Sequence, residues 1–187
     1  WANFNVSASA NLIREAAGLT TQIKGETIPT DKPGAVSMTL RQPVGTVLSI
    51  VPWNGPVILG ARAIAYPLAC GNTVIFKGSE SSPSTHKLLA EAFLEAGLPP
   101  GVLNFLVTAP EDSAAVTEVL ISHESVRRVN FTGSTHVGRM IAQTSAKYLK
   151  RCLLELGGKA PFVVLDDADI EGAVNAAVFG AFLYQGQ

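Results

Sequence analysis

Short apolar runs rich in β-branched residues alternate with segments of helical periodicity along this chain, and the alternation limits the possible folds more than any other feature. Six runs predict strands, each close to Gly, Pro or Asn: residues 46–51, 73–76, 102–107, 128–131, 152–156 and 162–165. Two amphipathic helices are predicted between them, at residues 84–96 and 135–147. We therefore expect an α/β fold built on an open parallel sheet with crossover helices.

The composition fits a globular domain and disfavours some partners. Of the 187 residues, 47% are hydrophobic, and 14 Lys and Arg face 15 Asp and Glu, so the chain has no basic field for nucleic acid or an acidic membrane. Prolines and Arg62 interrupt the most hydrophobic stretch, which disfavours a membrane span. Cys70 and Cys152 match no metal-ligand spacing, so we expect no metal site, two buried inert thiols and a reducing, cytoplasmic setting.

Residues 27–39 differ from the rest because Pro, Asp, Lys and Gly are frequent there. Their flanks could pair as a two-stranded ribbon, so we expect a projecting β-hairpin arm at about residues 27–45 on a single domain that spans residues 1–187. The chain begins with Trp1 rather than Met, and its last apolar pattern reaches Gln187 without a stop signal. Both ends are therefore expected to continue into a longer protein.

Candidate site residues follow the predicted strands, and ligands of an open parallel sheet bind at the carboxyl ends of strands. In Pro52-Trp53-Asn54, the Asn54 amide could donate a hydrogen bond to a developing oxyanion, or could belong to an ordinary Asn-Gly turn. Lys77 and Glu80 leave the second strand together. They could grip the hydroxyls of a ribose, although a solvated ion pair explains them equally well.

Two further groups follow later strands. Residues 131–138 combine a strand end, a turn at Gly133-Ser134 and a helix start, where free backbone N–H groups could meet a pyrophosphate. A P-loop would need Lys and Ser or Thr where Arg139-Met140 stands, so ATP chemistry is disfavoured. Glu155 ends an apolar run, and apolar surroundings favour a carboxylate that takes a proton from water near neutral pH. A structural Glu paired with a neighbour is the alternative.

Together these groups resemble the aldehyde dehydrogenase family in their order and spacing. Residues 154–159 (Leu-Glu-Leu-Gly-Gly-Lys) are similar to the family's glutamate signature, residues 131–138 with Gly133, Ser134 and Gly138 to its cofactor turn, and residues 52–54 to its oxyanion segment. Lys77 and Glu80 are similar to its adenosine-ribose contacts. The resemblance implies a Rossmann-like NAD-binding domain, with the catalytic domain beyond residue 187.

The resemblance also implies a reaction in two stages. A cysteine thiolate adds to the aldehyde while Asn54 and a backbone N–H hold the oxyanion, and hydride then passes to NAD. Water that Glu155 deprotonates hydrolyses the thioester. The family's nucleophile follows a Gln-Gly-Gln-like segment, here residues 185–187, so residues 1–187 alone are expected to be inactive. Gly101 is expected near the adenine, and Pro52, Trp53 and Leu156 beside the cofactor channel.

A finer resemblance, through residues 53–65 and 127–139, is to the members that oxidise aromatic aldehydes such as salicylaldehyde and vanillin. Ile58 and Arg62 lie four and eight residues after Asn54, so they could line one wall of a substrate tunnel, with Arg62 reaching a ring hydroxyl. A surface salt bridge is the alternative for Arg62. Trp1 could add an aromatic wall or simply pack.

Three questions stay open at this stage. Glu80 favours NAD because its charge would repel the 2'-phosphate of NADP, yet some members of the family take both. The hairpin resembles the family's oligomerisation hairpin, which implies a homodimer or homotetramer. A non-catalytic nucleotide-binding or structural protein that reuses the cofactor domain is the alternative function.

Overall fold

A five-stranded parallel sheet forms the centre of the computed structural model, which describes residues 1–184 and 187. The strand order is β5-β4-β3-β6-β7. The strands are β3 (Thr46–Ile50), β4 (Thr73–Lys77), β5 (Leu103–Leu106), β6 (Val126–Gly133) and β7 (Arg151–Leu156). The predicted α/β class and five of the six predicted strands are confirmed. The β-branched and other apolar residues of these runs explain this, since such residues favour a pleated surface that packs against its neighbours.

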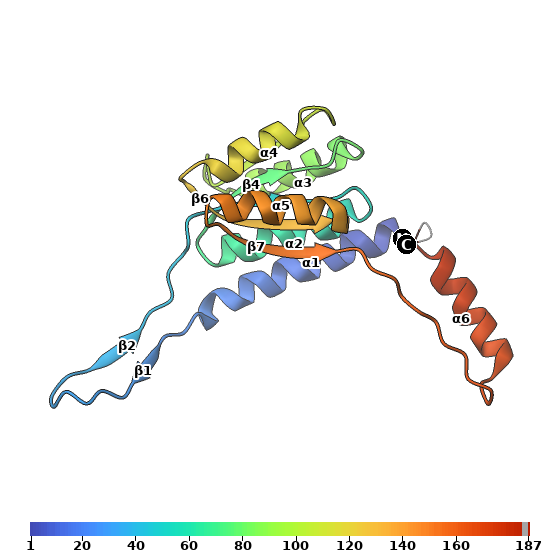
Figure 1. The fold of residues 1–187 in the computed structure, drawn as a ribbon, viewed down its shortest axis with the longest axis horizontal. Coiled ribbons are helices and arrows are strands. Elements are labelled where there is room, and N and C mark those ends of the chain that lie inside the picture. The colour runs from blue at the N-terminus through green and yellow to red at the C-terminus, as the bar shows by residue number, and fades with distance from the viewer. Residues whose placement is uncertain (185–186) are drawn as a thin grey trace.

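Four helices connect these strands and cover both faces of the sheet (Figure 1). They are α2 (Pro56–Ala69), α3 (Pro83–Glu95), α4 (Ser113–Ser122) and α5 (Thr135–Lys147). The chain moves outward from β3 through β4 to β5, then returns and moves the other way from β6 to β7. Because crossovers are right-handed, this reversal places α2 and α3 on one face and α4 and α5 on the other.

Each face has its own hydrophobic core, which the alternation of side chains along the strands supplies. On β4, Val74 and Phe76 pack with Ala63 and Ile64 of α2 in one core, whereas Ile75 packs against the other. The reversal of the chain also creates a topological switch point between β3 and β6, which are neighbours although they lead away from each other. Ligands bind at such a point in open α/β sheets.

The prediction of a sixth strand at residues 162–165 is wrong. These residues have no regular secondary structure, and all four side chains are exposed. A β-branched run becomes a strand only where a neighbouring strand accepts its hydrogen bonds, and none of the described residues pairs with this one. Instead an extended segment leads from β7 to α6 (Ile170–Phe182), which stands apart from the sheet in Figure 1.

The two ends of the chain meet beside the sheet (Figure 1). The first helix, α1 (Ala2–Leu19), packs along α2, and Tyr66 donates a hydrogen bond to Glu15 across this contact at 2.7 Å. The ring of Trp1 lies 4.4 Å from that of Tyr184, measured between centroids. The segment just after α6 is therefore brought next to the start of the chain. Gln185 and Gly186, part of the predicted Gln-Gly-Gln segment, lie outside the described residues.

A two-stranded antiparallel ribbon projects from the body between α1 and β3 (Figure 1). It consists of β1 (Glu26–Ile28) and β2 (Ser37–Thr39), so the paired part is shorter than the predicted arm and ends before residue 40. The side chains of Ile28, Val36 and Met38 are exposed on it. A ribbon of this kind has an apolar surface and free strand edges.

The expectation of two buried thiols is wrong for one of them. Cys70 is exposed, because it caps the carboxyl end of α2 rather than lying within it, and Cys152 on β7 is half-buried. Both line a groove of about 820 Å³ between α2 and the β6–β7 edge, which shares Arg62 and Glu155 with the lining of a cavity at the switch point. Within the described part of the chain, no helix is long and apolar enough to cross a membrane, and no group of three metal-binding side chains is found.

The buried histidine of α3 makes the stability of this fold sensitive to acid. Burial lowers the pKa of His86 from 6.5 to about 4, although the Pro56 backbone acts in the opposite direction. The unfolded chain therefore binds a proton between pH 6.5 and 4 that the folded chain does not. We expect His86 alone to lower the free energy of unfolding by about 3 kcal/mol as the pH drops through this window, and to contribute nothing further below it.

Urea unfolding at several pH values measures this effect. In His86→Asn the acid-dependent loss is expected to disappear, whereas in His123→Asn, which changes an exposed histidine, the wild-type loss is expected to persist. An unchanged pH profile in His86→Asn would show that other groups are responsible.

Candidate active site

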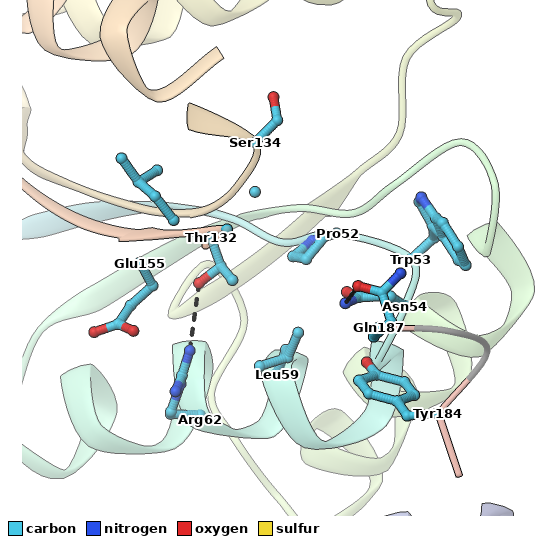
Figure 2. A pocket seen from close by; sticks show the side chains of 13 residues that line it. Pro52, Trp53, Asn54, Leu59, Arg62, Thr132, Ser134, Glu155, Tyr184 and Gln187 are labelled. Atoms are coloured by element: carbon cyan, nitrogen blue, oxygen red, sulfur yellow. Dashed lines mark hydrogen bonds between the residues drawn. The ribbon is translucent and has the colours of Figure 1, made fainter. Parts of the chain in front are cut away.

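A cavity of about 500 Å³ opens at the switch point, beyond the carboxyl ends of β3, β6 and β7. Figure 2 shows Glu155 at one side, Asn54 and Trp53 at the other, and Arg62, Thr132 and Pro52 between them. The lining residues are Pro52, Trp53, Asn54, Leu59, Arg62, Thr132, Gly133, Ser134, Glu155, Leu156, Gly157, Tyr184 and Gln187. The structure thus gathers three of the four predicted groups around one space.

Asn54 lies in the short link between β3 and the start of α2. It is half-buried, and its amide Nδ2 donates a hydrogen bond to Oε1 of Gln187 at 3.3 Å. The amide oxygen Oδ1 is buried without a hydrogen-bond partner. The long Nδ2 contact joins two uncharged groups and is open to solvent, so an oxyanion could replace Gln187 at little cost.

Glu155 is the penultimate residue of β7 and lies opposite Thr132 in the β6–β7 register. Its side chain is exposed, whereas the sequence predicts apolar surroundings. The reason is that β7 is an edge strand, and the face of β7 from which Glu155 projects is not covered by a helix of the described chain. The ion pairs within 4.0 Å among the described residues do not include it, so the alternative of a paired structural glutamate has no support. The carboxylate is open to water and to the cavity.

The turn after β6 brings the start of α5 to the cavity wall. Ser134 caps α5, and its hydroxyl accepts a hydrogen bond from the Val137 N–H at 3.3 Å. The other N–H groups at this helix start have no intrahelical acceptor, and together with the helix dipole they favour an anion. Gly138 is buried on α5, where a Cβ would lie 2.5 Å from Cδ2 of Leu156. The glycine therefore lets Leu156 reach the cavity.

Lys77 is the last residue of β4 and Glu80 lies in the turn that follows, and neither lines the cavity at the switch point. The ammonium of Lys77 is buried and donates a hydrogen bond to the hydroxyl of Ser113, at the start of α4, at 2.9 Å. Burial lowers the pKa of Lys77, while the negative charge of Glu80 opposes the shift. Glu80 is exposed, and the two do not form an ion pair within 4.0 Å. Each can offer its charged group separately to a ligand.

The side chain of Arg62 points from α2 into the cavity, and its guanidinium donates a hydrogen bond to the Thr132 hydroxyl at 3.4 Å (Figure 2). The ion pairs found within 4.0 Å among residues 1–184 and 187 do not include Arg62. Ile58 does not line the cavity, and Leu59 takes that place. Ile58 and Leu59 lie four and three residues before Arg62, so helical spacing brings both near it and does not distinguish them. Trp1 lies behind Tyr184 and touches it rather than the cavity.

The structure corrects the expectation for Gly101. This glycine has a φ of +82° in the turn that precedes β5, so it lies at the amino edge of the sheet. It lines a separate cavity of about 290 Å³ with Thr46, Thr73 and Val126, which begin or precede their strands. Gly101 therefore lies apart from the candidate residues that line the cavity at the switch point.

Some lining residues were not predicted. Leu59 could have been found from its helical spacing to Arg62, and Thr132 from its place in the turn already identified. Tyr184 carried no local signal, because α6 reaches the cavity only through the extended segment after β7. The contact of Ser113 with Lys77 was also not predicted, because the helix that begins at Ser113, α4, was not predicted.

Comparisons with known proteins agree with this geometry. The family model described as "Aldehyde dehydrogenase family" matches residues 1–187. A crystal structure of a salicylaldehyde dehydrogenase from Pseudomonas putida G7, complexed with salicylaldehyde, is 67% identical with a TM-score of 0.96, and the match covers 100% of this chain and 39% of that one. A vanillin dehydrogenase of Pseudomonas fluorescens is 60% identical over 187 residues, which are 100% of this chain and 39% of that protein.

A more distant structure, an NAD-dependent benzaldehyde dehydrogenase from Corynebacterium glutamicum, is 38% identical with a TM-score of 0.90. The match covers 100% of this chain and 40% of that one. The chain thus spans about two fifths of the length of the relatives it matches. Since the family model covers every residue, the chain belongs to the aldehyde dehydrogenase family.

Proposed function

We propose that these residues form most of the NAD-binding domain of an enzyme that oxidises an aromatic aldehyde to its carboxylic acid. The observation that carries the proposal is the cavity at the switch point, where an amide donor and a water-accessible carboxylate face one space from opposite sides (Figure 2). Aldehyde oxidation through a covalent intermediate needs both groups, one for the oxyanion and one for the water.

A dinucleotide fits the residues that line and flank this cavity. The N–H groups at the start of α5, beside Gly133 and Ser134, suit a pyrophosphate, and Pro52, Trp53 and Leu156 offer apolar surface. Lys77 and the exposed Glu80 suit ribose hydroxyls, and the charge of Glu80 favours NAD over NADP. When bound, the nicotinamide would supply the hydride acceptor.

The roles of the chain's own residues follow from their positions. The Asn54 amide N–H donates to the oxyanion that forms when a thiolate adds to the aldehyde, and Gln187 gives up that hydrogen bond. Glu155 then takes a proton from a water molecule, and the resulting hydroxide attacks the thioester carbonyl. Neither Cys70 nor Cys152 lines the cavity, so neither is proposed as the nucleophile.

Arg62 is proposed to select aromatic aldehydes that carry a ring hydroxyl. Its guanidinium already donates to a neutral hydroxyl, that of Thr132, and it is half-buried in the cavity wall. The relatives named for salicylaldehyde and vanillin support this choice, because both of those substrates carry such a group. Tyr184, with the ring of Trp1 packed behind it, would close the aromatic side.

Arg62→Leu in the full-length protein tests the substrate proposal. We expect kcat/KM for salicylaldehyde to fall about tenfold, as for loss of one charged hydrogen bond, and kcat/KM for benzaldehyde to change less than about twofold. NADH formation followed at several aldehyde concentrations measures both. Arg139→Leu, on the exposed side of α5, is the control. An equal fall with both aldehydes would reject recognition of the hydroxyl.

The ribbon formed by β1 and β2 is proposed to pair with another subunit. Its exposed apolar side chains and free edges would be covered by a second copy of the protein, as a homodimer or homotetramer. The free, exposed thiol of Cys70 supports a reducing compartment such as the cytoplasm.

A further inference from the structure

Lys77 ends β4 and Glu80 lies in the turn from β4 to α3, and His86 supports this turn from inside the protein. His86 lies in the first turns of α3 and its side chain is 0% exposed. Its ring nitrogen Nδ1 accepts a hydrogen bond from the backbone N–H of Ser79 at 3.1 Å. Ser79 stands between the two proposed ribose contacts, so this bond fixes the backbone from which both side chains leave.

The ring also interlocks with the turn through close packing. A Cβ at Gly78 would lie 2.8 Å from His86 Nδ1 and 2.9 Å from Cε2 of Phe105, so only glycine lets the backbone lie against the imidazole. The ring of Phe76 meets the imidazole edge-on, with centroids 5.2 Å apart and planes at 77°. The imidazole therefore has one well-defined position beneath the turn.

The protonation state of His86 matches this acceptor role. Burial lowers its pKa to about 4, so the ring is neutral near pH 7. Because Nδ1 accepts the Ser79 N–H, the ring hydrogen is on Nε2. Nε2 is buried and has no hydrogen-bond partner among the described residues. The nearby backbone of Pro56 favours the charged imidazolium, and so opposes part of the lowering of the pKa. Pro56 starts α2, two residues after Asn54.

We propose that His86 is a positioning residue of the cofactor site, which holds Lys77 and Glu80 at the spacing that a ribose requires. The inference rests on the proposed function, because it takes Lys77 and Glu80 to be the ribose contacts. His86 itself touches no ligand: it acts through the Ser79 backbone. Without a buried acceptor, the Ser79 N–H must turn toward water, and the turn moves with it.

Two substitutions in the full-length protein separate this role from a general contribution to stability. His86→Phe keeps most of the ring volume and removes the acceptor. His86→Asn keeps an acceptor oxygen at the place of Nδ1 but leaves space where the rest of the ring was. We expect the KM and Kd for NAD to rise about tenfold in His86→Phe, as for loss of one buried hydrogen bond, with kcat at saturating NAD unchanged. In His86→Asn both constants should stay within about threefold of wild type although Tm falls.

The combination of affinity and thermal stability decides the outcome. An NAD affinity that follows Tm in both variants, or that is unchanged in folded His86→Phe, overturns the proposal. If His86→Phe does not fold, His86→Gln replaces it, since its amide lies near the Nε2 position and leaves Nδ1 without a substitute. Lys77→Met and Glu80→Gln are measured in parallel. If Lys77→Met and Glu80→Gln leave the NAD affinity unchanged, the proposed ribose site is wrong. If they weaken NAD binding and His86→Phe does not, only the role of His86 is rejected.

Discussion

Replacing Glu155 with Gln in the full-length protein is expected to leave the first turnover intact and to slow every later one by about 10²- to 10³-fold. The amide keeps the shape of the carboxylate at the end of β7 but cannot take a proton from water. Adduct formation and hydride transfer do not need Glu155, so one equivalent of NADH should still appear in a burst. Hydrolysis of the thioester should then limit the rate.

Stopped-flow measurement of NADH separates the burst from the steady state. Glu124→Gln is the matched control, because Glu124 is also exposed but lies at the amino edge of the sheet before β6. An equal loss of burst and steady-state rate would assign Glu155 a structural role. A hydroxylamine rescue of turnover in Glu155→Gln, without rescue of the burst, would independently identify an accumulated acyl group.

Replacing Asn54 with Ala is expected to lower both the burst rate and the steady-state kcat by about 10²- to 10³-fold, the usual cost of one oxyanion donor. The oxyanion forms before hydride transfer and again during hydrolysis, so no stage escapes the loss. This pattern differs from that of Glu155→Gln, in which the burst survives. The two variants therefore assign the two sides of the cavity to different steps.

The control for Asn54 is Asn104→Ala. Asn104 also donates an amide hydrogen bond, to the Gly101 carbonyl at 2.8 Å, but at the opposite edge of the sheet. Its removal should leave kcat within about twofold of wild type. A burst that is as fast in Asn54→Ala as in the wild type would contradict the oxyanion role.

The central sheet was predictable because strand identity here depends on local residue type. Runs such as residues 46–51 and 73–76 are apolar enough to be buried on both faces, and nearly any parallel arrangement makes them strands. Residues 162–165 have the same local pattern but no neighbouring strand to pair with among the described residues. A pairing partner is a property of the tertiary structure, which no local pattern reveals.

The site was predictable to the extent that topology alone determines it. Asn54 follows β3 and Glu155 is the penultimate residue of β7, and parallel strands bring their carboxyl ends to one edge, so their meeting follows from the strand order. Gly101 was misplaced because it precedes its strand, which puts it at the other edge. The hydrogen bonds from Lys77 to Ser113 and from Ser79 to His86 depend on which helices flank the turn, and the sequence pattern does not specify side-chain contacts of this kind.

A crystal structure of the full-length protein with NAD bound tests the central claim most directly. We expect the pyrophosphate beside Ser134 at the start of α5, a ribose between Lys77 and Glu80, and the nicotinamide in the cavity between Asn54 and Glu155. Density for the dinucleotide at the amino edge of the sheet, beside Gly101, or anywhere that leaves the cavity at the switch point empty, would contradict the account.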